Sequence, residues 1–251
     1  MLWVKNLGIM LCIAGAATLT GCGTTAKFTY PADASQLLKT SATNATRDQD
    51  VSVPPFEDLR GNKNQFGTVF LYLIPLSPMG FMRYERPDAA RTFNTVQEFD
   101  FDAQEDLAKA AAYSLRESNV FNNAFFTFGG RKNESDLILK GQILSTTYKG
   151  QTWSYGLSIF GPMLWFIGLP AGTSENDLEL GLTLRDRDTD QVIWEHEYKL
   201  DRKIVQGLYY RFGHDTRGYA YLMQDIMNKA IQGMRQALAN ESSVAAKQTQ
   251  H

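Results

Sequence analysis

The 251-residue sequence has few of the side chains that build chemical sites, since it contains only two cysteines and three histidines. So few cysteines exclude a disulfide-rich scaffold, and the small Cys and His count leaves almost no material for a zinc site. Positive charge is also not in excess, because 25 Lys and Arg stand against 27 Asp and Glu, for a net charge of −2. A broad nucleic-acid-binding surface needs such an excess, so that class of function is excluded as well.

What the chain does have is apolar material. Hydrophobic residues make up 43% of it, which is enough for a sizeable core and too much for a disordered protein. The length allows one large domain or two small ones. The sequence therefore predicts a globular body with little equipment for catalysis.

Residues 1–21 have the pattern of a secretory signal. One positive charge, Lys5, precedes an uncharged apolar run over residues 7–20, which is too short to span a bilayer and has the length of a signal-peptide core. The run ends in Leu19-Thr20-Gly21-Cys22, which resembles the lipobox of bacterial lipoproteins. That resemblance implies cleavage before Cys22 and attachment of fatty acyl chains, palmitate among them, to its thiol and new amino group. An ordinary secretory signal with an incidental cysteine is the alternative.

The consequences of that cleavage set the expected location. Cys12 would leave with the signal, and more than one acyl chain on Cys22 makes a stable anchor where a single chain is marginal. Residue 23 is Gly and not Asp, which by resemblance to enterobacterial lipoproteins favours the outer membrane. We therefore expect an outer-membrane, lipid-anchored protein that faces the periplasm, with a periplasmic or outer-membrane protein or a second copy as partner.

The mature chain divides into three parts. Residues 22–50 are rich in Thr, Ala, Ser and Asp and predict a lipidated tether that would reach about 30 Å, although the segment from Phe28 to Tyr30 is able to order on a partner. Residues 51–240 predict a single periplasmic domain. Residues 241–251 predict a polar tail.

Within the domain, the order of patterns predicts an α+β fold. Val51, Val53 and Phe56 begin an edge-like strand that Pro54 and Pro55 interrupt. Asp102-Ala-Gln-Glu105 resembles a capping box that opens a helix to about Glu117, and a second amphipathic helix is expected over roughly residues 217–239. Strands are expected at residues 120–128 and 136–145, with a hairpin at 178–185 and 192–199. These elements predict a mixed, mostly antiparallel sheet with helices packed on one face.

That order, together with Val53-Pro-Pro-Phe-Glu-Asp-Leu59, Ser135-Asp-Leu-Ile-Leu-Lys-Gly-Gln-Ile143 and Asp188-Thr-Asp-Gln-Val-Ile-Trp-Glu195, resembles envelope lipoproteins with a domain like the TolB N-terminal domain. The curli-secretion lipoprotein CsgG, the Pel-polysaccharide lipoprotein PelC and the penicillin-binding-protein activator LpoB are of this type. The resemblance covers about residues 51–240. It implies a non-enzymatic outer-membrane protein that assembles or contacts periplasmic partners, and no catalytic residue carries over from it.

Two long inserts, at residues 64–82 and 150–174, contain no charged side chain. In the second insert, Trp153, Tyr155, Leu157 and Ile159 alternate with small polar residues, as in a membrane β-strand. Gly161 and Pro162 would turn the chain, and Trp165 and Phe166 lie on the return. Three interpretations stay open: a membrane hairpin over residues 151–172, a flap buried in the core or against a second copy, and a loop that dips into the lipid surface.

A second candidate contact surface is dense in aromatic and arginine side chains, which are enriched at protein interfaces. Its members are Tyr209, Tyr210, Arg211, Phe212 and Tyr221. The alternative is that they cover the edge of the sheet.

Motifs for chemistry are weak. Asp186, Asp188, Asp190 and Glu197 have the spacing of a calcium loop, but the glycine needed at its sixth position is Gln191, so a solvated hairpin turn is expected. His196 is predicted to face the core, and His214-Asp215 lacks the motif of a nucleophilic enzyme. We expect no enzyme activity, no metal and no cofactor. The sequence favours a lipid-anchored scaffold or accessory subunit of an envelope assembly; the alternative is an oligomeric lipoprotein that forms an export pore.

Overall fold

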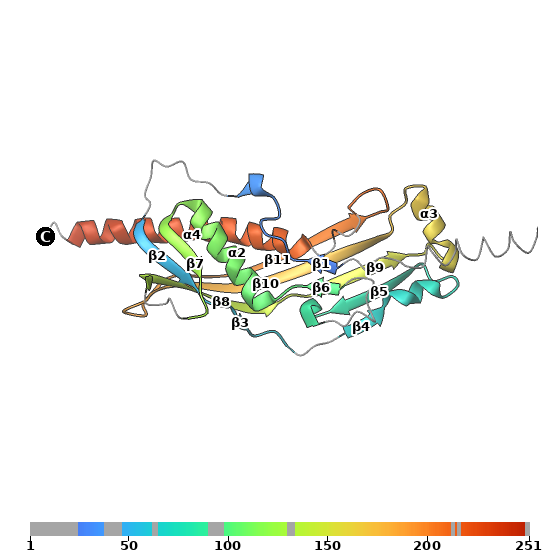
Figure 1. The fold of residues 1–251 in the computed structure, drawn as a ribbon, viewed down its shortest axis with the longest axis horizontal. Helices are drawn as coiled ribbons and strands as arrows, with labels where there is room; N and C mark the ends of the chain where they lie inside the picture. The colour runs from blue at the N-terminus through green and yellow to red at the C-terminus, as the bar shows by residue number, and fades with distance from the viewer. Residues whose placement is uncertain are drawn as a thin grey trace, which may run out of the picture.

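A computed structural model describes residues 25–37, 47–61, 65–89, 98–129, 134–211, 214 and 217–248. Figure 1 shows an elongated sheet with the helices α2 (Ala103–Ser118) and α4 (Gly218–Gln248) on one of its faces. The predicted α+β class, with a mixed and mostly antiparallel sheet, is confirmed. None of the described helices is long and apolar enough to cross a bilayer.

Nine strands of the described chain form the main sheet. Along its main path the order is β4 (Gln65–Thr68), β5 (Met79–Tyr84), β9 (Tyr148–Trp153), β10 (Gly172–Asp186), β8 (Leu137–Ser145), β2 (Arg47–Val53) and β7 (Phe121–Phe126). Strand β11 (Val192–Gln206) pairs with β10, and β3 (Glu57–Asp58) pairs with β8. Within this sheet, parallel pairing is confined to β2 and β3 with their neighbours.

Strands β10 and β11 form the hairpin that the alternating pattern predicts, and they are the longest strands of the described sheet. Each strand has 15 residues, which at about 3.3 Å per residue gives a length of about 50 Å. The first residues of β10 pair with β9 and its last residues pair with β8, so two shorter strands lie end to end along it. The inward leucines of β10 are fully buried: Leu178, Leu180, Leu182 and Leu184.

The helices begin where predicted, but α4 does not end near residue 239: it continues to Gln248, into the residues predicted as a polar tail. The Asp102 carboxylate accepts hydrogen bonds from the backbone N–H groups of Gln104 and Glu105, which caps α2. The reciprocal bond comes from Asp106, whose carboxylate accepts from the Asp102 N–H at 2.9 Å, and not from Glu105. Leu107, Ala111 and Leu115 of α2 and the apolar stripe of α4 close one core against the sheet.

Two strand predictions were wrong. Strand β2 lies between β7 and β8 and is not an edge strand. Pro54 and Pro55 lack the N–H groups that a ladder needs, so β2 ends at Val53 and the chain resumes as β3 beside the same neighbour, β8. His196 does not lie in the core: it is exposed on β11, between the rings of Trp194 and Tyr198.

Part of the range predicted as a tether packs on the domain. Strand β1 (Thr25–Lys27) pairs in parallel with β6 (Glu98–Asp100), and Phe28 stacks on Phe101 at 5.1 Å between ring centroids. Further on, the backbone N–H and C=O of Asp33 bond to the amide side chain of Gln224 on α4. We call residues 25–37 the N-terminal strap. The sequence allowed the segment from Phe28 to Tyr30 to order on a partner, and here the protein's own helices supply that surface.

Candidate functional site

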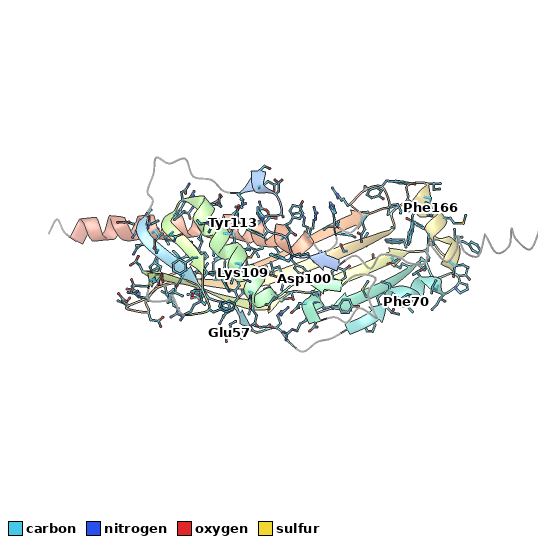
Figure 2. All side chains as sticks on the ribbon, viewed as in Figure 1. Glu57, Phe70, Asp100, Lys109, Tyr113 and Phe166 are labelled. Atoms are coloured by element: carbon cyan, nitrogen blue, oxygen red, sulfur yellow. The ribbon has the colours of Figure 1, made fainter. Side chains whose placement is uncertain are left out.

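The two charge-free inserts meet at one end of the molecule. The first forms the 3-10 helix η2 (Val69–Leu73), and the second forms η6 (Ser158–Phe160) and the short helix α3 (Pro162–Phe166). The Leu76 N–H donates to the Gly156 carbonyl at 3.2 Å, and the Ser158 hydroxyl donates to the Leu73 carbonyl. Figure 2 shows Phe70 and Phe166 at this same end. We call residues 69–78 and 154–171 the apolar tip.

The tip presents apolar side chains to its surroundings. They are between 40% and 87% exposed: Phe70, Leu73, Ile74, Leu76, Leu157, Ile159, Phe160, Met163, Phe166 and Ile167. A monomeric soluble protein seldom exposes a contiguous apolar patch of this kind without a contact to make. The tip is therefore the strongest candidate for a functional surface.

The second insert does not form the membrane β-hairpin that its alternation suggested. Strand β9 ends at Trp153, and Tyr155 and Ser158 then take positive φ values of 57° and 52°. A strand needs extended backbone throughout, so these two residues break the alternation and the chain continues as helical turns. Leu157, Ile159 and Phe166 point outward, as a contact role requires.

The other predicted contact residues of this insert brace the tip from within. The Trp165 indole N–H donates to the Trp153 carbonyl at 2.9 Å, and the Tyr155 hydroxyl donates to the Pro170 carbonyl at 2.7 Å. Within this chain, the interpretation as a flap buried in the core holds at the root of the tip; burial against a second copy stays a prediction. At the root, Val69 and Met82 pack with Tyr84 and Tyr148 in a second, small core.

The second predicted surface divides in two. Tyr209 is 70% exposed, and its hydroxyl donates to the Phe166 carbonyl at 2.9 Å, so it extends the tip. Tyr210 and Arg211 follow it and are exposed. Tyr221 lies apart on α4, where the Arg202 guanidinium covers its ring at 4.2 Å. Phe212 and the predicted lipidation site Cys22 lie outside the described residues.

A row of charged side chains crosses the sheet at the root of the tip. Arg83 on β5 is the register partner of Lys149 on β9, which is in turn the partner of Glu175 on β10. Glu175 is also the partner of Lys203 on β11. The Lys149 ammonium contacts the carboxylates of Glu175 at 2.7 Å and Asp177 at 3.3 Å, and the hydrogen bond to Glu175 is the main cause that raises its pKa.

Neither this row nor the outward residues Phe70, Ile74, Phe160, Met163 and Ile167 were predicted as contact residues from sequence. The boundaries of the charge-free runs do mark the row in the sequence. Residues 64–82 are followed by Arg83, and residues 150–174 lie between Lys149 and Glu175. Only strand register shows that these residues are neighbours.

A buried charge network fixes the strands that carry the tip. The Arg60 guanidinium donates to both carboxylate oxygens of Asp58 at 2.8 and 2.9 Å and to both of Asp88 at 2.7 and 3.0 Å. A further bond reaches the Thr146 hydroxyl at 2.7 Å. The bond from Arg60 holds the pKa of Asp58 below its usual value, whereas burial opposes that shift. This network joins the segments that flank β5 and β9.

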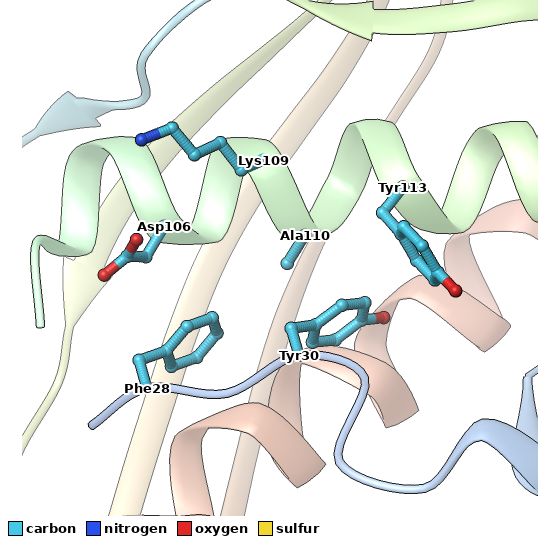
Figure 3. Close-up of a pocket in the computed structure, with 6 residues that line it drawn as sticks. All are labelled: Phe28, Tyr30, Asp106, Lys109, Ala110 and Tyr113. Carbon is cyan, nitrogen blue, oxygen red and sulfur yellow. The ribbon is translucent and has the colours of Figure 1, made fainter. Parts of the chain in front are cut away.

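The N-terminal strap forms the second candidate site, an open pocket of about 260 Å³ against α2. Figure 3 shows Phe28 and Tyr30 of the strap beside Asp106, Lys109, Ala110 and Tyr113 of the helix. Tyr30 and Ser114 share a hydrogen bond through their hydroxyls. Burial raises the pKa of Tyr30 to about 12. These are the marks of a packed segment and not of a reactive centre.

The calcium-like spacing forms a hairpin turn, as expected. The Asp186 carboxylate accepts from the backbone N–H groups of Asp188 and Thr189 and from the Thr189 hydroxyl. Asp190 pairs with Arg185 at 3.2 Å. Across the described part of the chain, no group of three His, Cys, Asp or Glu side chains is placed to hold a metal ion.

Comparison with known proteins gives only distant likenesses. No family model and no curated protein matches the chain. Among solved structures, protein XCC0632 from Xanthomonas campestris, of the family DUF330, is 9% identical with a TM-score of 0.45, over 85% of this chain and 97% of that one. The PelC dodecamer from Paraburkholderia phytofirmans is 13% identical with a TM-score of 0.37, over 78% and 94%. A neuraminyllactose-binding hemagglutinin homologue from Helicobacter pylori is 9% identical with a TM-score of 0.32, over 78% and 95%. None of these likenesses is near enough to carry an assignment of function.

Proposed function

We propose that this protein is a non-enzymatic, lipid-anchored protein of the bacterial cell envelope, which acts as a scaffold or accessory subunit of an outer-membrane or periplasmic assembly. One observation carries the proposal: β1, the first strand that the structure describes, already packs on the domain at Thr25, only three residues after Cys22, the residue predicted to be lipidated. Whatever its conformation, a stretch of three residues spans at most about 10 Å. Acyl chains on Cys22 would therefore hold the domain at the membrane surface, where a tether of residues 22–50 would have let it range further.

The scaffold role is supported by the surface that the domain offers. Most of its exposed large apolar side chains belong to the tip, Phe70 and Phe166 among them (Figure 2), and such a surface suits contact better than chemistry. The export pore remains the alternative from sequence. It requires residues 151–172 as two membrane strands, whereas most of the segment forms turns, η6 and α3.

The test compares the two cysteines of the chain. Cells that express the wild type, Cys22→Ser or Cys12→Ser are fed a palmitate analogue, and the protein is assayed for label, mass and membrane fractionation. We expect Cys22→Ser to lose the label and to keep the uncleaved signal. Cys12→Ser should behave as the wild type, because Cys12 lies in the discarded segment. Equal labelling of wild type and Cys22→Ser would refute the lipid anchor.

A further inference from the structure

The charged row at the root of the tip is a sharp border in polarity. On its tip side, the strands β5, β9, β10 and β11 and the connections between them contain no Asp, Glu, Lys or Arg, over residues 66–82, 150–174 and 204–210. The row itself carries three cations, Arg83, Lys149 and Lys203, and the anion Glu175, and Lys149 also pairs with Asp177 on the side away from the tip. Because register partners in an antiparallel sheet point to the same face, these four side chains line up across one face of the sheet.

The spacing of the border from the tip fits the thickness of a membrane surface. Four residues separate Lys149 from the end of β9 at Trp153, which is about 13 Å of strand. Helices that bind at a lipid surface enter it by about 5–10 Å. When the turns beyond Trp153 are inserted to that depth, the charged row lies on the water side of the headgroups, where Lys and Arg are attracted to anionic lipid.

The composition of the tip favours lipid over a protein partner. A protein interface has a polar rim around its apolar core, whereas the charged side chains at this end are the border row and Arg211, an exposed cation that follows Tyr210. Trp153, Tyr155 and Trp165 of the second insert are half-buried, and the exposed Tyr209 donates to the Phe166 carbonyl of the tip. Trp and Tyr are enriched at membrane–water interfaces. The tip lies at one end of the long axis of an elongated body (Figure 1), whereas a standard protein interface needs about 800 Å² of matched surface on each partner.

We propose that the apolar tip inserts into the surface of a phospholipid bilayer, with the row Arg83, Lys149, Glu175 and Lys203 on the water side of the headgroups. The long axis of the domain then rises from the membrane surface, and the turn between β10 and β11 points away from it. This inference rests on the proposed envelope location, but it does not require that Cys22 be acylated.

Site-specific fluorescence on the full-length protein tests the inference. Met163→Cys and Ile74→Cys place one thiol on each half of the tip, and Gln191→Cys places one in the turn at the other end of β10. Each protein is purified from membranes, labelled with an environment-sensitive fluorophore and reconstituted into vesicles of phosphatidylethanolamine and phosphatidylglycerol. We expect both tip labels to shift to shorter wavelength and to be quenched by lipids brominated in their acyl chains. The label at residue 191 should emit as it does in water.

Other outcomes overturn the inference. Tip labels that emit as in water while the protein stays on the vesicles would refute tip insertion and leave the lipid anchor intact. Tip labels that are shielded but insensitive to bromolipid would show that a second copy or another protein covers the tip. The wild-type chain, which carries no added cysteine, is the labelling control. If it takes up the fluorophore, the Cys22 thiol is free and the proposed acylation is refuted. The comparison between the labels at residues 163 and 191 still reports on the tip in that case.

A substitution pair provides the second arm. Phe166→Asp combined with Ile167→Asp puts two charges on the tip and should abolish the shift and the bromolipid quenching of the label at residue 163. Phe128→Asp is the matched control, because Phe128 is equally exposed but follows β7 at the opposite edge of the sheet. Loss of the signal in both variants would point to a general effect on folding and would overturn the assignment to the tip.

Discussion

Removal of the Arg60 guanidinium tests how the tip is held. The Arg60 side chain is 2% exposed and makes four bonds to the carboxylates of Asp58 and Asp88. Arg60→Met keeps the length of the side chain and leaves these acids without their main partner. Breaking a buried ion pair in this way costs about 3–5 kcal/mol. Because Asp58 keeps a contact with Arg86 and both acids are partly accessible, we expect the lower end, about 3 kcal/mol.

Equilibrium unfolding in urea, followed by circular dichroism and tryptophan fluorescence, measures this loss. With a slope of about 2 kcal/mol per molar, the midpoint should fall by about 1.5 M. Arg187→Met is the control, because its pair with Asp188 is exposed on the turn, where a salt bridge contributes about 0–1 kcal/mol. Asp88→Asn in the Arg60→Met background should recover part of the stability by removing one orphaned charge.

The pH dependence of the same pair gives an independent check. Since the pKa of Asp58 is lowered in the folded protein, its contribution is present above the unfolded pKa and is lost as the pH falls through the folded value. The difference between wild type and Arg60→Met should therefore shrink in acid. A loss below about 1 kcal/mol at neutral pH, with no such trend, would refute a stabilising role of the network.

Three further predictions concern the local devices of the fold. Asp102→Ala removes the cap of α2 and should cost about 1 kcal/mol, read by thermal unfolding; an unchanged melting temperature would contradict the cap. Gly80→Ala places a Cβ 1.8 Å from the Val69 carbonyl oxygen, so it should cost about 1–3 kcal/mol or more and expose η2 to limited proteolysis; wild-type resistance would contradict this close packing. Burial raises the pKa of Tyr30 to about 12 from an unfolded value of 10.0, so its contribution is present below pH 10.0 and is lost as the pH rises to about 12. In Tyr30→Phe, the free energy of unfolding should fall by about 2–3 kcal/mol less over this pH range. Identical alkaline unfolding curves for both proteins would refute this prediction.

The sequence predicted the elements whose periodicity is set by one dominant core. The leucines at every second position of β10 and the apolar stripe of α4 face a single layer boundary, so pattern and structure agree. Periodicity failed where position in the sheet decides burial. His196 alternates in phase with buried residues, yet β11 is a neighbour of β10 alone and α4 covers only part of it.

The tip shows a second limit of sequence reasoning. The absence of charge marked both inserts, but it could not show that the hydrogen bond from Leu76 to Gly156 and the one from Ser158 to Leu73 join them. The alternation from Trp153 to Ile159 suggested a strand, because a hydrophobic pattern does not show whether a residue has a negative or a positive φ. The positive φ values of Tyr155 and Ser158 depend on the packing of the turn as a whole.

Whether the tip is a structural or a contact element can be decided with two methionines. Met82 lies in the small core at the root and is 8% exposed, whereas Met163 on α3 is 64% exposed. The same change, Met→Ala, should cost about 2–5 kcal/mol at Met82, because it leaves a cavity. At Met163 it should stay within about 0.5 kcal/mol, as for surface positions in general. If Met163→Ala lowers the free energy of unfolding in urea as much as Met82→Ala does, the tip belongs to the core of the protein, and its apolar side chains are explained without contact to a membrane.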